Sequence, residues 1–222
     1  MTTPSERLIE VQGLRHDIAG RCVMDVPAFS AARGEHTLLI GPSGSGKTTL
    51  INVITGLITP TSGEVRIDGQ PMSSLPPARR DQLRRRTIGV VFQTLRLISA
   101  LTVRQNLSLA QTLALGHAEP AIIEDLIGRV GLNHRADAMP RELSHGEGQR
   151  AAIARALCAR PAIVVADEPT SALDDANAQA MADLLLSTAE ATGATLLIAT
   201  HDNRLRDRFP RTLALSAPQV TA

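Results

Sequence analysis

Short apolar runs alternate with stretches of helical periodicity along most of the chain. Apolar runs bounded by glycine, proline or aspartate indicate buried strands, whereas apolar residues recurring every three or four positions indicate helices. The strands predicted in this way are residues 8–11, 21–28, 36–40, 64–67, 87–92, 162–166, 195–199 and 212–215. The predicted helices are residues 47–56, 79–86, 103–115, 120–130, 147–159, 175–191 and 203–208.

The order of these elements predicts an α/β fold. Alternating strands and helices imply a mainly parallel sheet covered on both faces, with ligands bound at the carboxyl ends of its strands. Residues 101–160 interrupt the alternation, because the pattern there is helical throughout, and with the connector before them they make up a lobe of about residues 94–160. We therefore expect a single domain (1–222), built from a core of residues 1–93 and 161–222 and an inserted helical lobe.

Composition narrows the class of protein without identifying a ligand. With 43% hydrophobic residues in 222, the chain can bury a sizeable core without disulfides or metals. A net charge of +1 excludes a global field that would attract nucleic acid or an anionic membrane. No apolar run approaches the roughly 20 residues of a membrane span. Cys22 and Cys158 lack metal-site spacing and the N-terminus is not signal-like, so we expect a reducing, cytosolic setting.

A glycine-rich loop lies between the predicted strand 36–40 and the following helix. The loop comprises Gly41, Pro42, Ser43, Gly44, Ser45, Gly46, Lys47, Thr48 and Thr49, a G-x-x-x-x-G-K-[ST] pattern. Glycines allow successive N–H groups to turn around the α- and β-phosphates, and the helix N-terminus favours negative charge. Lys47 then reaches the β/γ-phosphates, and the Thr48 hydroxyl coordinates Mg²⁺. The pattern predicts binding of a nucleoside triphosphate.

Two acids follow the apolar strand 162–166. A buried parallel strand that ends in a carboxylate supplies the second Mg²⁺ contact of a phosphate-loop enzyme, here Asp167. The next residue, Glu168, would polarise the attacking water. A strand that merely ends in solvated acids is the alternative, and the phosphate loop makes it the weaker one.

Residues 141–150 precede the next predicted helix and contain Ser144, with Glu147 three positions later. This spacing is that of a helix capping box. The segment also resembles the Leu-Ser-Gly-Gly-Gln/Glu signature of the ATP-binding-cassette (ABC) ATPases. The family's other motifs are also present in the expected order along the chain. They are Gln93 after residues 90–92, the turn 171–174, and His201 after strand 195–199. The resemblance covers essentially the whole chain.

This resemblance implies a RecA-like core, an N-terminal antiparallel β subdomain, and ATP with Mg²⁺ as ligands. In the family, two cassettes pair head to tail, so that ATP lies between the phosphate loop of one and the signature of the other. Ser144 and Gly146, with Glu147 beside them, would then contact the ATP held by a second ATPase subunit, most simply a second copy of this chain.

The remaining motif residues receive roles from the same resemblance. Gln93 would help to hold Mg²⁺ and sense a transmembrane subunit. His201 would contact the γ-phosphate and link it to Glu168, and Asp174 would lie at the dimer seam.

The chain departs from the family pattern at two positions. His145 replaces the first signature glycine, which places an imidazole beside the partner's phosphate. Where relatives place an aromatic residue over adenine, residues 16–20 offer Ile18, and the chain has neither Tyr nor Trp. Because stacking on a base contributes roughly 1–3 kcal/mol, we expect lower nucleotide affinity.

Two surface segments indicate which macromolecules the protein would bind. Five arginines lie on the predicted helix 79–86 with Asp81 and Gln82 but without interleaved aromatics, which favours a solvated face over a nucleic-acid site. The segment from Gln93 to Val103 is apolar for a connector. It could be core, but it resembles the surface on which cassettes receive the coupling helices of transmembrane permease subunits.

Residues 69–75, the arginine-rich helix, 88–93 and 166–170 together resemble the lipoprotein-releasing, macrolide-exporting and cell-division subgroup. The leading hypothesis is an ATPase subunit of an exporter at the cytoplasmic face of the inner membrane. The alternative is an ATPase that signals mechanically to extracytoplasmic enzymes without transport. Soluble cassettes acting on DNA or ribosomes are disfavoured, since those usually carry two cassettes or long insertions.

Overall fold

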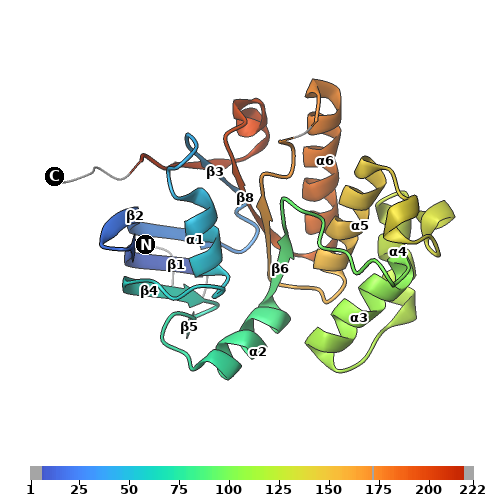
Figure 1. Cartoon of the computed structure of the whole chain (residues 1–222), viewed down its shortest axis with the longest axis horizontal. Helices are drawn as coiled ribbons and strands as arrows, with labels where there is room; N and C mark the ends of the chain where they lie inside the picture. Colours follow the sequence, from blue (N-terminus) through green and yellow to red (C-terminus); the bar gives the residue numbers. More distant parts are fainter. Residues whose placement is uncertain (1–6, 172, 218–222) are drawn as a thin grey trace.

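The computed structural model describes residues 7–171 and 173–217, and two sheets organise them (Figure 1). The larger sheet has five parallel strands in the order β6-β7-β8-β3-β9. Because β3 pairs with β8 and β9, the loop that follows β3 lies beside the ends of two strands that come much later in the sequence. The strands are β3 (Thr37–Ile40), β6 (Ile88–Val91), β7 (Ile163–Asp167), β8 (Thr195–Thr200) and β9 (Arg211–Ala214).

The smaller sheet is antiparallel, with the strand order β2-β1-β4-β5. Its longest strands meet at Ala19-Gly20, where φ values of 49° and 77° suit a two-residue hairpin turn. Asp68-Gly69 forms a second turn of this kind, with φ values of 52° and 74°. The strands are β1 (Arg7–Ile18), β2 (Arg21–Ala32), β4 (Ser62–Ile67) and β5 (Gln70–Pro71).

Side chains alternate between the two faces of the parallel sheet, as the period of two in a strand requires. On β7, Val164 and Ala166 pack among residues of α3 to α6. Ile163 and Val165 pack on the other face, among residues of α1 and the antiparallel sheet. All four are fully buried, so the strand reads as a continuous apolar run.

The helices cover both faces of this sheet. Helix α1 contacts β7 and β8 on one side and β2 and β4 on the other. Helices α3, α4 and α5 contact one another and lie together at the right of Figure 1. A Cβ on Gly89 of β6 would lie 2.1 Å from the Ala156 carbonyl oxygen, so α5 packs directly against the sheet. The helices are α1 (Lys47–Ile54), α2 (Pro77–Thr87), α3 (Val103–Leu115), α4 (Pro120–Arg129), α5 (His145–Leu157) and α6 (Asp175–Thr192).

The predicted α/β fold is confirmed, and the differences are local. Helix α3 has the predicted bounds, whereas α5 begins two residues before the predicted start at 147, because Ser144 caps it. Strands β1 and β2 extend beyond the predicted 8–11 and 21–28, because they pair with each other over most of their length. The predicted helix 203–208 is a 3₁₀ helix. Within residues 7–171 and 173–217, no helix has the length and apolarity needed to cross a membrane.

Both cysteines are free thiols. Cys158 is fully buried, and burial raises the pKa of its thiol to about 12, so it packs as a small apolar side chain. Cys22 is half-buried.

Candidate active site

The loop between β3 and α1 is closely packed at two glycines. A Cβ on Gly41 would lie 2.5 Å from the Leu215 carbonyl oxygen. Gly46 has a φ of 88°, and a Cβ there would lie 2.7 Å from the Val23 carbonyl oxygen. Only glycine satisfies both conditions at Gly46, so the loop keeps its path directly against the antiparallel sheet.

Two buried polar side chains lie in this loop. Lys47 is 7% exposed, and its Nζ donates to the carbonyl oxygens of Gly41 at 2.7 Å and Pro42 at 3.1 Å. Ser45 is 3% exposed, and its Oγ has no hydrogen-bond partner among the described residues. A cation and an unpaired hydroxyl therefore meet at the N-terminus of α1, which suits the phosphates of a nucleotide. Pro42, Ser43 and Gly44 are exposed, and Thr49 is half-buried.

Thr48 and Asp167 place two oxygen atoms side by side. The Thr48 hydroxyl donates to Asp167 Oδ1 over 3.4 Å. Burial, helped by the charge of Glu168, raises the pKa of the Asp167 carboxyl, although the Thr48 bond opposes the shift. The described residues contain no cluster of three or more His, Cys, Asp or Glu that would hold a metal alone. Mg²⁺ in nucleotide sites needs only one or two protein oxygens besides phosphates and waters, so this pair fits it.

Glu168 is held by three contacts at the ends of β7 and β8. Its φ of 51° is left-handed, which is uncommon for a residue other than glycine, and its backbone N–H donates to the Ala199 carbonyl at 2.8 Å. Thr200 Oγ1 donates to Glu168 Oε2 at 3.0 Å, and His201 Nδ1 lies 2.9 Å from Oε1. Lys47 Nζ is 3.9 Å from the same Oε1. The side chain thus projects toward the phosphate loop.

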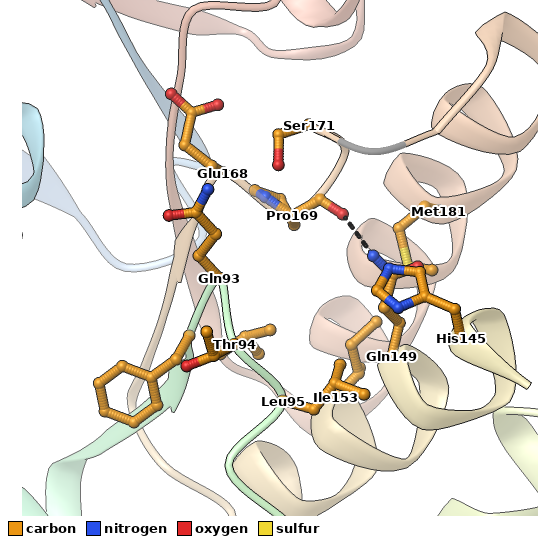
Figure 2. A pocket seen from close by; sticks show the side chains of 12 residues that line it. Gln93, Thr94, Leu95, His145, Gln149, Ile153, Glu168, Pro169, Ser171 and Met181 are labelled. Carbon is orange, nitrogen blue, oxygen red and sulfur yellow. Dashed lines mark hydrogen bonds between the residues drawn. The ribbon is translucent and has the colours of Figure 1, made fainter. Parts of the chain in front are cut away.

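Gln93 follows β6 and faces a cavity of about 440 Å³ between the parallel sheet and α5. Figure 2 shows Gln93 beside Glu168 on one wall, with His145 and Gln149 on the opposite wall. Gln149 Nε2 donates to the Pro169 carbonyl at 3.4 Å, the bond drawn in the figure. The cavity therefore separates the predicted catalytic residue from the start of α5.

The start of α5 is built by a complete capping box. Ser144 Oγ accepts from the Glu147 N–H at 3.3 Å, and Glu147 Oε2 accepts from the Ser144 N–H at 2.7 Å. Arg135 donates to Glu147 Oε1 at 3.0 Å. These bonds, those from Ser144 first, lower the pKa of the Glu147 carboxyl to about 2. The carboxylate of Glu147 is therefore used within its own chain, whereas Ser144 and His145 are exposed and Gly146 is half-buried.

Ile18 ends β1 at the hairpin that packs on the phosphate loop, and it is 57% exposed. An isoleucine so exposed leaves an apolar side chain at the tip of this hairpin.

Of the residues predicted from sequence, Lys47, Thr48, Asp167, Glu168 and His201 lie together at one edge of the parallel sheet. Asp174 caps α6 by accepting from the Asn177 N–H, and Ala172 of the predicted turn lies outside the described residues. Sequence reasoning missed Thr200, because a threonine at the end of a strand carries no motif of its own.

The family model for "ABC transporter" matches residues 24–171. The dimeric structure of MJ0796, described as a bacterial ABC transporter cassette, shares 31% identity and a TM-score of 0.85, covering 96% of this chain and 97% of that one. The same values hold for its dimeric post-hydrolysis state bound to ADP and Pi. CbiO1 from Clostridium perfringens, part of the ABC transporter complex CbiONQ, shares 27% identity over 98% of this chain and 88% of its own, with a TM-score of 0.86. The match covers the phosphate loop and both acids, and the chain belongs to the ABC transporter family as one of its ATPase cassettes.

Proposed function

We propose that this chain is the ATP-hydrolysing subunit of an export-type ABC transporter and acts as a homodimer with separate transmembrane subunits. The observation that carries the proposal is the position of Glu168, whose Oε1 faces Lys47 Nζ at 3.9 Å across the phosphate loop. A carboxylate fixed beside the phosphate-binding cation is suited to orient water for attack on the γ-phosphate.

Each residue of the site has a physical task in this proposal. The N–H groups at the start of α1 and the free Ser45 hydroxyl would bind phosphate oxygens. Lys47 would exchange its two carbonyl partners for phosphate oxygens, which are stronger acceptors. Mg²⁺, when bound, neutralises phosphate charge, and Thr48, Asp167 and Gln93 would hold it.

Glu168 accepts the proton of the attacking water in this scheme, and His201 helps to hold its carboxylate. An ionised carboxylate only accepts hydrogen bonds, so the 2.9 Å contact requires the proton on His201 Nδ1. The imidazole of His201 is largely exposed, and in this proposal its other nitrogen, Nε2, would contact the γ-phosphate.

The second half of the site would come from another copy. Ser144 is exposed at the N-terminus of α5, and Gly146 in the first turn leaves that end of the helix open. We propose that these residues contact the ATP bound to the partner copy. The dimeric structures of MJ0796 support this arrangement.

The segment from Gln93 to Val103 is the proposed contact with the transmembrane subunits, at the cytoplasmic face of the membrane. Asn106 fixes this segment, because its amide donates to the carbonyls of Ile98, Leu101 and Thr102. Ile98 itself is 47% exposed. A rigid loop with an exposed apolar side chain suits a partner helix, and we further propose that the lobe formed by residues 94–160 moves with it.

Lys47 offers a direct test, because it is the only lysine of the 222-residue sequence. An amine-reactive reagent can therefore modify only Lys47 and the N-terminal amine. We expect ATP with Mg²⁺ to protect Lys47, measured by mass spectrometry, while labelling of the N-terminus stays unchanged as an internal control. Lys47→Ala should also abolish ATP binding and hydrolysis. Equal labelling of Lys47 with and without ATP, or unchanged affinity in the variant, would remove the proposal.

A further inference from the structure

We infer that Thr200 is a positioning residue for hydrolysis, because its hydroxyl fixes one carboxylate oxygen of Glu168 so that the other faces the phosphate loop. The inference rests on the proposed ATPase function. It concerns a residue that belongs to none of the motifs identified in the sequence, and it follows from contacts at the ends of β7 and β8.

The Thr200 hydroxyl has one proton, and its surroundings direct that proton to Glu168. The backbone N–H of Asp202 donates to Thr200 Oγ1 at 3.0 Å, which occupies the acceptor side of the oxygen. The hydroxyl in turn donates to Glu168 Oε2 at 3.0 Å. Thr200 is fully buried, so no competing bond to bulk water is available.

His201 holds the other oxygen less firmly. Its side chain is 59% exposed, whereas that of Glu168 is 14% exposed. His201 also bonds Oε1, the same oxygen that faces Lys47 Nζ. A carboxylate held only at Oε1 would be free to rotate about the Cγ–Cδ bond of Glu168. The buried hydrogen bond from Thr200 to Oε2 prevents this rotation.

Asp202, whose N–H donates to the Thr200 hydroxyl, is itself held in place. Asp202 Oδ2 accepts from Thr170 Oγ1 at 3.2 Å, and Arg204 donates to both oxygens of Asp202. Thr170 is fully buried and lies two residues after Glu168. The loops that follow β7 and β8 are therefore tied at two points, and this fixes the N–H that orients Thr200.

Thr200→Val removes the hydroxyl at nearly constant shape. Hydrogen bonds to charged groups are among the stronger ones in proteins, so we expect kcat for ATP hydrolysis to fall about 10- to 100-fold. KM for ATP should stay within about two-fold, since the hydrogen bonds of the Thr200 hydroxyl go to Glu168 and Asp202 and not to a residue of the phosphate loop. Slow hydrolysis should also lengthen the lifetime of the ATP-bound dimer, whereas a general loss of structure would not. Thr200→Ser keeps the donor and should recover most of kcat.

Thr195→Val is the matched control. Thr195 begins the same strand, is 1% exposed, and uses its hydroxyl to accept the Gly34 N–H at 2.8 Å, away from Glu168. The two valine variants thus make the same chemical change at opposite ends of β8.

The inference fails if Thr200→Val and Thr195→Val have the same kcat, or if Thr200→Ser is as slow as Thr200→Val. If the valine variant does not fold, Thr200→Cys replaces it, since its S–H is a weak donor and the expected order of kcat is Thr, Ser, then Cys. Equal rates in all three would overturn the inference. A wild-type chain without ATPase activity would instead overturn the proposed function, and this inference with it.

Discussion

Replacing Gly46 by alanine tests how closely the phosphate loop is packed. The new methyl would face two conflicts. The backbone φ of 88° is unfavourable for any residue with a Cβ, at about 1–2 kcal/mol. The Cβ would also lie 2.7 Å from the Val23 carbonyl oxygen and 3.0 Å from Met24 Cβ, and both belong to β2. Relief requires movement of the strand, at about 1–3 kcal/mol.

Gly44→Ala separates these two contributions. Gly44 has a φ of 80°, but a Cβ there would meet nothing within 4 Å. Gly44→Ala should therefore lower the free energy of unfolding by about 1–2 kcal/mol and Gly46→Ala by about 2–5 kcal/mol. In a chain of this size, about 2–4 °C of Tm corresponds to 1 kcal/mol, so Gly46→Ala should melt roughly 2–12 °C below Gly44→Ala. Calorimetry of the nucleotide-free variants measures this difference. Equal Tm values would refute the packing of the loop on β2.

Two further predictions concern pH and nucleotide affinity. His36 Nδ1 accepts from the Leu196 N–H at 3.0 Å, and burial lowers its pKa in the folded protein. The unfolded chain then binds more protons below about pH 6.5, so the free energy of unfolding should fall as pH drops from 7 toward 5. His36→Gln should flatten that slope in urea titrations, and an unchanged slope would contradict the assignment. Ile18→Tyr should tighten ATP binding about 5- to 150-fold in calorimetric titrations, since stacking on a base contributes roughly 1–3 kcal/mol. Unchanged affinity would mean that adenine lies elsewhere.

The sequence predicts elements best where their end signals are local. Helix α3 has its predicted bounds because Thr102 and Gln105 form a capping box and Gly116 ends the helix in the left-handed conformation. The lengths of β1 and β2 depend instead on pairing between strands, which a short apolar run does not reveal. The 3₁₀ helix at Asn203–Arg208 has i→i+3 hydrogen bonds and a tighter turn than an α-helix, and a stretch of six residues carries no sequence pattern that separates the two.

The same distinction between local and long-range signals applies to the residues of the candidate site. Residues from Gly41 to Thr49 form a contiguous pattern, so their placement around one loop could be predicted. The strand order brings Asp167, Glu168 and His201 to that loop, and the rule that ligands bind at the carboxyl ends of parallel strands anticipates it. The contacts of Glu168 with Thr200 could not be predicted, because they depend on a left-handed backbone at Glu168 and on side-chain rotamers.

The central proposal is that each chain holds half of a shared ATP site. Glu168→Gln tests it most directly, because the variant keeps the shape of the side chain but removes the acceptor for the proton of the attacking water. Its molar mass in solution, measured by light scattering with ATP and Mg²⁺, should be that of a dimer with little turnover, and that of a monomer with ADP. A variant that stays monomeric in ATP, or that hydrolyses ATP at the wild-type rate, would contradict the account.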